Sequence, residues 1–414
     1  MFWAILYALI NVIILIRYVK MDMGVVKAPF LMAYASLFVL LPQLFTVTVN
    51  PFYDTDNLPF FSIFISLCNV SFVVGFERSI NKRRQILINK FTLKNVWFVF
   101  FVTLILGLTS LFFWNDSFQG SDNVIPVTLK GFAQYSCCLV LVDMLHSKNK
   151  VGIQKKILLL ISVFPLIYFA FFVKGSRSEI VFLLLLFAYY LYKKYPLKYK
   201  KITLLFFIAL VAGSVLSASI EIMRKVYIYG DLESQNDKIS YFDTFVSSFS
   251  DKSEMASGLD MGNAMIGIEY LRKHNQVDFG FSIWDDIVQD FVPSRFVGDN
   301  TKNALKFNMV NDSRIRASLS QGVTTMTGYY FAYRYFSFLG FIFFGLMGYL
   351  FGYFWQGRLN SMFYEFAYLA LLGVLVSLFS HEPRYVYSKL FYIYVIIKPL
   401  GLGNFKHKST GLFY

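Results

Sequence analysis

A short turn that begins at Lys174, "KGSRSE", combines residues suited to binding an anion. Ser176 and Glu179 have the spacing of a capping box, which starts a helix, and Gly175 permits a tight chain reversal. A helix N-terminus offers free N–H groups and the positive end of the helix dipole. We expect Lys174 and Arg177 to bind phosphate oxygens there, Arg177 foremost because its planar fork can hold two of them. The alternative is that both side chains only reach lipid head groups.

Four further cations stand near the ends of apolar runs, namely Lys130, Arg295, Arg334 and Arg384. Arg295 in "VPSRF" follows an amphipathic segment and a proline, although it is equally compatible with a plain surface position. Arg334 lies in the aromatic stretch "GYYFAYRYF", where a charge needs a partner. If the apolar runs pack into one bundle, we expect these cations to line one cavity together with the "KGSRSE" turn.

Three residues are candidates for moving a proton. His381 and Glu382 lie in a short turn beside Arg384, a suitable place for proton transfer. Asp286 belongs to "DDIVQD", whose three aspartates resemble the acidic motifs that hold magnesium in intramembrane prenyltransferases. A solvated helix face is the favoured interpretation of these aspartates, and a general base, for which Asp286 is the candidate, is the alternative. We therefore expect neither a metal nor a cofactor.

The elements that must position these residues are membrane spans. The chain is 57% hydrophobic and contains recurring apolar runs of bilayer length, which is typical of a polytopic membrane protein. The net charge of +14 is dispersed among short loops, so it does not indicate nucleic-acid binding. We predict an all-α bundle of about 11 transmembrane helices near residues 2–19, 28–49, 58–76, 93–114, 124–145, 156–173, 178–193, 202–221, 337–355, 362–380 and 385–400.

Loop charges predict the orientation of these spans. The loops "RYVKMDMGVVK", "ERSINKRRQILINKFTLK", "HSKNKVGIQKK" and "KKYPLKYKK" and the tail are basic, whereas "NPFYDTDN" and "NDSFQGSD" carry only acids. Because basic loops stay in the cytoplasm, we expect a periplasmic N-terminus, a cytoplasmic C-terminus and acidic turns outside.

One connection is far longer than the others. Residues 222–336 hold 14 acids against 12 lysines and arginines, and they include "SIWDDIVQDFV", whose apolar spacing predicts an amphipathic helix. The predicted organisation is therefore spans one to eight over 1–221, a large helical external loop between the eighth and ninth spans over 222–336, spans nine to eleven over 337–400, and a tail over 401–414.

An external cationic cavity beneath a cap rich in aromatic, amide and acidic side chains suits a lipid diphosphate that carries sugars. Cations stabilise the charge that develops on a departing diphosphate, and a base assists the acceptor hydroxyl. The order of spans, the "GSR" turn, and "DFVPSRF", "KNALKFN" and "GVTTMTGYYFAYRYFSFLGFIFFGLMGYLFG" resemble the Wzy-type O-antigen, or oligosaccharide repeat unit, polymerases.

This resemblance implies a metal-independent glycosyltransferase of the bacterial inner membrane. Such an enzyme transfers a growing glycan from undecaprenyl diphosphate to the non-reducing end of a new lipid-linked repeat, with Arg177 and Arg295 as diphosphate ligands. Its partners would be the undecaprenyl-diphosphate-linked oligosaccharide, the bilayer, a chain-length regulator and a flippase, and no nucleic acid. Three alternatives remain: a flippase for the same lipid, an O-antigen ligase, and a non-enzymatic scaffold.

Overall fold

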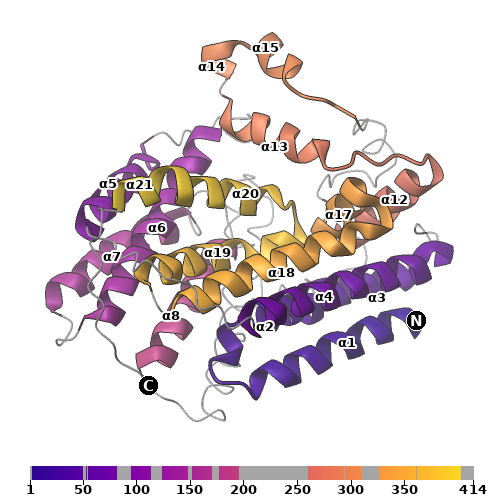
Figure 1. Ribbon diagram of the computed structural model, residues 1–414, viewed down its shortest axis with the longest axis horizontal. Helices are drawn as coiled ribbons and strands as arrows, with labels where there is room; N and C mark the ends of the chain where they lie inside the picture. Colours follow the sequence, from indigo (N-terminus) through magenta and orange to yellow (C-terminus); the bar gives the residue numbers. More distant parts are fainter. Residues whose placement is uncertain are drawn as a thin grey trace, which may run out of the picture.

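The computed structural model describes residues 2–49, 53, 55–81, 95–112, 124–147, 152–169, 177–194, 260–292, 294–309, 326–359 and 361–401. Every regular element in these ranges is helical, and the long helices lie side by side (Figure 1). The first group is α1 (Phe2–Val19), η1 (Gly24–Val26), α2 (Ala28–Ala35), η2 (Ser36–Leu40), α3 (Leu41–Val49), η3 (Thr55–Asn57), α4 (Leu58–Asn81), α5 (Val96–Thr109), α6 (Val124–His146), α7 (Ile153–Tyr168) and α8 (Arg177–Lys194). The second is α12 (Asp260–Lys273), α13 (Phe281–Phe291), α14 (Ser294–Val297), α15 (Asp299–Ala304), α17 (Gly328–Phe336), η8 (Ser337–Leu339), α18 (Gly340–Gly357), α19 (Met362–Ser380), α20 (Arg384–Phe391), η9 (Tyr392–Ile397) and α21 (Lys398–Gly401).

Several of these helices have the length and apolar composition of membrane-spanning helices. Within the described residues, five helical segments are long and apolar enough to cross a bilayer: Phe2–Val19, Ala28–Thr48, Thr55–Asn81, Gly328–Gly357 and Met362–Ser380. Their outward side chains are apolar as well, since Leu9 and Ile13 of α1 are 54% and 65% exposed. The all-helical, membrane-embedded class is therefore confirmed.

The number of spans stays a prediction. The apolar helix α5 has only 14 residues, whereas a span was expected over 93–114. Helix α8 covers the expected span over 178–193, and α20, η9 and α21 together cover that over 385–400. The expected span over 202–221 lies outside the described residues.

The segment 337–355, expected to be a span, is helical as η8 and α18, and a further helix, α17, precedes it. Ser337 has a left-handed φ of 53°, and the chain reverses there, so α17 folds back on α18. A Cβ added to Gly340 would overlap the carbonyl oxygen of Ala332, which shows how closely the two helices approach. Residues 328–335 are buried throughout, although they were expected to form the end of the external loop. Their aromatic side chains account for the difference, because packing them against α18 and α19 removes them from solvent.

Small residues allow α18 to pack tightly on α4. Cβ atoms added at Gly348 and Gly75 would overlap the carbonyl oxygens of Phe72 and Gly345, respectively. The two backbones are therefore in direct contact, as in many pairs of membrane helices that meet through small residues. Gly345 is less crowded, since an added Cβ would lie 3.5 Å from the carbonyl oxygen of Ser71.

This difference predicts the effect of two alanine substitutions. Gly348→Ala should force α4 and α18 apart and lower stability by about 1–3 kcal/mol, the usual range for overpacking. Gly345→Ala, on the same helix, should be tolerated because its new methyl group would make an ordinary van der Waals contact. Thermal unfolding of the purified protein in detergent measures both. Equal melting temperatures for the two variants would contradict the packing described above.

A buried polar network ties α17 to the first helices. The Asn69 amide donates to the side-chain oxygens of Asn11 and Ser36 at 2.9 and 3.0 Å, and the Tyr329 hydroxyl donates to Asn69 Oδ1 at 2.8 Å. Asn11, Ser36, Asn69, Tyr7 and Tyr329 are all fully buried. Because a polar group without a partner is expensive in an apolar interior, the network specifies how these helices dock.

Side-chain contacts sort the helix ends into two groups. At one end, Tyr18 donates to Glu77, Tyr192 donates to Asp22, and Glu365 contacts His146 at 2.6 Å. The helix ends that border the basic loops therefore lie together at one end of the bundle, which we call the basic end. Which side of the membrane this end faces stays a prediction.

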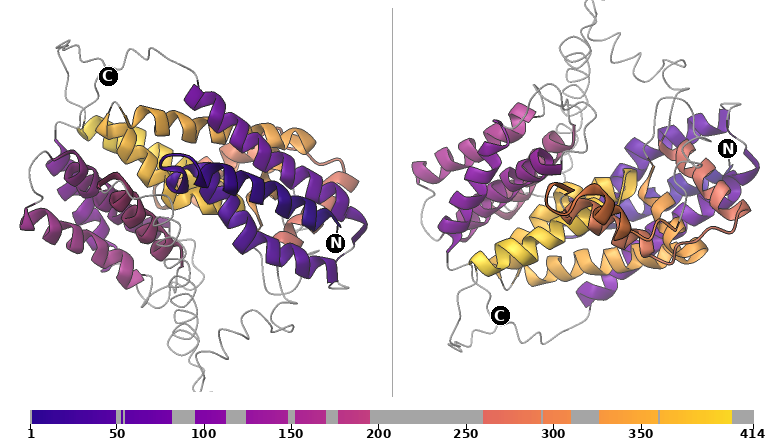
Figure 2. Two further views of the ribbon diagram at one scale, coloured as in Figure 1. Left: turned by 90° about the horizontal axis from the view of Figure 1, so that it is seen from below. Right: turned by 90° about the horizontal axis from the view of Figure 1, so that it is seen from above.

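The opposite end is covered by helices from the long connection expected over 222–336. Helix α13 lies across α20, and the ring centroids of Phe291 and Phe391 are 3.9 Å apart. Figures 1 and 2 show α14 and α15 beyond α13, on its far side from the bundle. The backbone N–H of Met261, at the start of α12, donates to Gln43 of α3 at 3.1 Å. The amphipathic helix predicted in "SIWDDIVQDFV" is thus present as α13.

Candidate functional site

Arg334 forms an ion pair beneath the outer helices. Its Nε donates to Asp278 Oδ2 at 2.9 Å, and the two side chains are 7% and 0% exposed. The Asp278 carboxylate also accepts from the backbone N–H of Gly280 at 2.9 Å and from the Ser282 hydroxyl. The positive charge of Arg334, which we expected to need a partner, is therefore paired with Asp278. An incoming diphosphate would compete with Asp278 for this guanidinium, so its role as a substrate ligand stays a prediction.

Asp286 of α13 faces the same region of the bundle. Its Oδ2 accepts from the hydroxyl of Tyr335 at 3.3 Å, and the buried hydroxyl of Tyr387 on α20 lies close by. The neighbouring Asp285 turns elsewhere, because its carboxylate accepts the backbone N–H groups of Phe307 and Asn308 at 2.7 and 3.0 Å. Asp285 therefore binds backbone N–H groups, whereas Asp286 lies beside buried hydroxyl groups.

Lys130 and Lys389 lie together inside the bundle, one or two turns from its outer end. Lys130 pairs with Glu179, which opens α8, and the side chains are 13% and 2% exposed. Lys389 of α20 donates to the side-chain oxygen of Gln134 on α6, and its ammonium is 4.6 Å from the centroid of the Tyr135 ring. Within the described residues, no carboxylate pairs with Lys389. Among the described residues, this cluster of Lys130, Lys389 and Glu179 thus contains two basic side chains and one acidic side chain.

Lys389 was not among the residues selected from the sequence, although a signal was present. It is a lysine inside the apolar stretch "SKLFYIYVII" of the last expected span. An ionisable residue within a span is by default a candidate functional residue. The partners of Lys389 could not be predicted locally, because Gln134 and Tyr135 lie about 250 positions away in the sequence.

The turn between α19 and α20 holds three other candidates. Glu382 and Arg384 form an ion pair at 2.6 Å, each 32% exposed, and Arg384 also lies over the ring of Tyr385. His381 is exposed. The structure thus brings Glu382 and Arg384 together and leaves His381 accessible to solvent.

The two arginines expected to hold the diphosphate are described only by their backbones. Arg177 is the first residue of α8, which agrees with the predicted cap at Ser176. Arg295 lies on α14, beyond α13 as seen from the bundle (Figure 1). Their side chains, like all of Lys174, lie outside the described residues.

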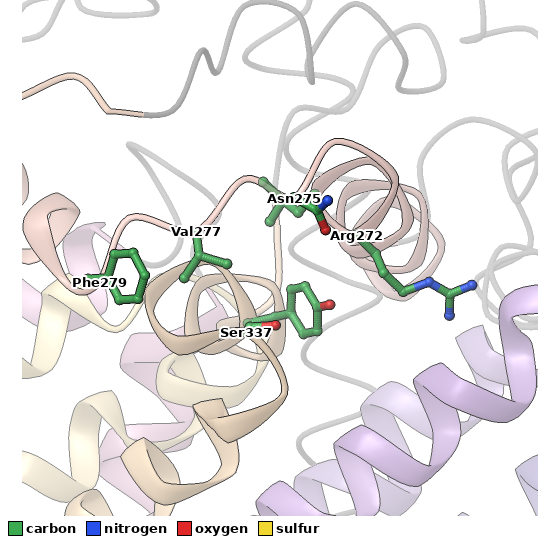
Figure 3. Close-up of a pocket in the computed structure, with 7 residues that line it drawn as sticks. Arg272, Asn275, Val277, Phe279 and Ser337 are labelled. Carbon is green, nitrogen blue, oxygen red and sulfur yellow. The ribbon is translucent and has the colours of Figure 1, made fainter.

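A pocket of about 360 Å³ borders the Arg334–Asp278 pair. Figure 3 shows its lining, which consists of Leu271, Arg272, Asn275, Val277, Phe279, Tyr333 and Ser337. Three of these, Asn275, Phe279 and Ser337, have left-handed backbones with φ of 49°, 50° and 53°. Such conformations are unfavourable for residues with side chains and persist where the surrounding structure enforces them, often at binding sites.

We compared the chain with models of protein families, with curated proteins and with solved structures, and none of the three comparisons found a match. The side chains themselves must therefore indicate what the site does. A buried lysine without an acid partner either loses its proton or is offset by a bound anion. Lys389 and Lys130 together offer two ammonium groups to such an anion, while Asp286 and Glu382 offer carboxylates that can accept a proton.

Proposed function

We propose that the protein is a membrane-embedded glycosyltransferase that polymerises oligosaccharide repeat units. It would transfer a growing glycan from undecaprenyl diphosphate to the non-reducing end of a new lipid-linked repeat. The observation that supports this most is the excess of buried positive charge at Lys130 and Lys389, which lie between apolar helices and, among the described residues, beside one carboxylate. An anionic group that enters from the membrane, such as a polyprenyl diphosphate, would offset that charge.

The proposed reaction needs no cofactor. The bond between the sugar's anomeric carbon and the diphosphate oxygen breaks, and the diphosphate leaves with the electron pair. The acceptor hydroxyl bonds to the same carbon, and its proton passes to a carboxylate or imidazole, for which Asp286, Glu382 and His381 are the candidates. Lys130 and Lys389, with Arg177 and Arg384, would stabilise the charge on the leaving group.

The pocket beside Asp278 suits a sugar residue of the substrate. Tyr333 and Phe279 provide aromatic faces, and Asn275 and Ser337 provide amide and hydroxyl groups that can bind sugar hydroxyls. The pocket is connected to the proposed diphosphate site through α13, since Tyr335 of α17 contacts Asp286 of α13, and α13 packs on α20, which carries Lys389.

The proposal extends to location and partners. We place the protein in the inner membrane of a bacterium, with the N-terminus in the periplasm, the C-terminus in the cytoplasm and the lysine cluster near the periplasmic face. A chain-length regulator and a flippase would act in the same membrane.

Deletion of the gene, followed by analysis of the surface polysaccharide, tests this proposal. Loss of a polymerase leaves a single repeat attached to the lipid A core. Complete loss of the polysaccharide with accumulation of the lipid-linked repeat inside the cell would instead indicate a flippase. Free polymer that never joins lipid A would indicate a ligase, and either of these results would overturn the proposal.

Arg177→Ala should abolish the polymer while leaving expression and single-repeat display intact. Arg177→Lys should also be impaired, because an ammonium group cannot reproduce the planar fork. The matched control is Lys194→Ala at the opposite end of the same helix. Gel profiles of the surface polysaccharide provide the measurement, and full-length chains in the Arg177→Ala strain would exclude a diphosphate role for Arg177.

A further inference from the structure

Two cations lie against one indole ring at the basic end of the bundle, far from the proposed catalytic groups. The guanidinium carbon of Arg358 is 3.7 Å from the centroid of the Trp355 ring, and Lys27 Nζ is 5.7 Å from the same centroid. Trp355 itself is only 6% exposed, and both cations are half-buried. The indole attracts each cation, but it carries no net charge with which to neutralise them.

The two charges lack an acidic partner in the part of the chain that the structure describes. The only hydrogen bond of the Lys27 side chain there goes to the sulfur of Met21 at 3.9 Å, and Arg358 Nε is buried without an acceptor. Burial and the nearby Arg358 charge both lower the pKa of Lys27, outweighing the opposing effects of Asp22 and Glu77. Arg17, at the same end, differs because it pairs with Glu77 at 2.9 Å.

The backbone that carries Lys27 is held in place. The Tyr368 hydroxyl donates to the carbonyl oxygen of Val26 at 2.8 Å, and the N–H of Met23 donates to the Tyr192 hydroxyl at 2.8 Å. These bonds fix the turn η1 against α19 and α8. Both cations are therefore held near one ring despite their repulsion, and an anion that contacts both would relieve that repulsion.

We infer that Lys27 and Arg358 bind a phosphate group, namely the phosphodiester of an anionic membrane lipid. Phosphate oxygens would accept hydrogen bonds from Arg358 Nε and Lys27 Nζ. The position suits a lipid head group, because α18 ends at Gly357, immediately before Arg358, and α2 begins at Ala28, immediately after Lys27. A soluble phosphate offers the same oxygens but no acyl chains. This inference is independent of the proposed glycosyltransferase function.

Thermal unfolding of the purified full-length protein in detergent tests the site and its ligand source. A ligand that binds only the folded state raises the melting temperature. Phosphatidylglycerol should raise the apparent melting temperature by about 2–4 °C, whereas phosphatidylcholine and inorganic phosphate at the same concentration should not. An equal shift with inorganic phosphate would assign the site to free phosphate and overturn the lipid assignment. An equal shift with phosphatidylcholine would overturn the recognition of anionic lipid.

Single-residue variants test whether the rise in melting temperature depends on Lys27 and Arg358. Arg358→Ala and Lys27→Ala should each remove most of the shift caused by phosphatidylglycerol, and Arg358→Lys should reduce it because the planar fork is lost. Lys20→Ala removes one exposed positive charge from the same end and should keep the full shift. If either alanine variant fails to fold, Arg358→Lys still tests the site. A wild-type shift in the folded Arg358 and Lys27 variants would refute the inference.

Discussion

Arg334→Met is expected to lower the stability of the protein by about 3–5 kcal/mol, since it leaves the carboxylate of Asp278 buried without its cation. Asp278 is fully buried, and its remaining donors are the N–H of Gly280 and the hydroxyl of Ser282. Losing the ion pair should therefore release the segment that connects α12 to α13, which also forms one wall of the pocket. Thermal unfolding in detergent, followed by intrinsic fluorescence, measures the loss.

A double-mutant cycle separates the ion pair from general effects of the substitutions. The double variant Arg334→Met with Asp278→Leu should be more stable than the sum of the two single effects predicts, because it buries no unpaired charge. Arg272→Met is the matched control, since this exposed arginine on α12 lies over the ring of Phe60 and should tolerate the change. Strict additivity of the two single variants would show that Arg334 and Asp278 are not energetically coupled.

Lys389→Met is expected to reduce polymer formation by about 100-fold or more, which is the effect of removing one group that stabilises charge in a transition state. Its effect on stability should be small. The substitution removes a buried charge that has no acid partner within the described residues, and this gain offsets the hydrogen bond that Gln134 loses. Polymer length and amount, together with the melting temperature of the purified variant, provide the measurements.

Loss of polymer with an unchanged melting temperature would identify Lys389 as a functional residue rather than a structural one. Lys398→Met, near the opposite end of the same continuous helix, is the matched control and should keep normal polymer. If Lys389→Met kept normal polymer, the buried lysines would not be the diphosphate site, although deletion of the gene could still reveal a polymerase with its site elsewhere.

The sequence predicted the features that depend on composition and local pattern. Helix α1 matches its expected span of 2–19, and α13 forms where apolar residues recur at helical spacing in "SIWDDIVQDFV". The helix ends that border the basic loops lie together at one end of the bundle, as the alternation of loop charges predicts. These signals are contained in short stretches of the chain, so no tertiary information was needed to find them.

Partners distant in the sequence could not be predicted in the same way. Nothing local to Arg334 indicates Asp278, 56 positions earlier, and nothing local to Lys130 indicates Glu179. The helix α17 and the reversal at Ser337 were also missed, because residues up to 336 were expected to belong to the external loop. The packing of α17 against α18 and α19 shows that residues 328–357 form a helical hairpin.

The attachment of the outer segment at two separate points has an evolutionary consequence. The N–H of Met261 binds Gln43, and Tyr329 binds Asn69, so residues before and after α13–α15 are anchored independently to the bundle. Changes in the length of α14 or α15 would leave both anchors in place. The outer segment can therefore vary in length and sequence without altering how the bundle packs.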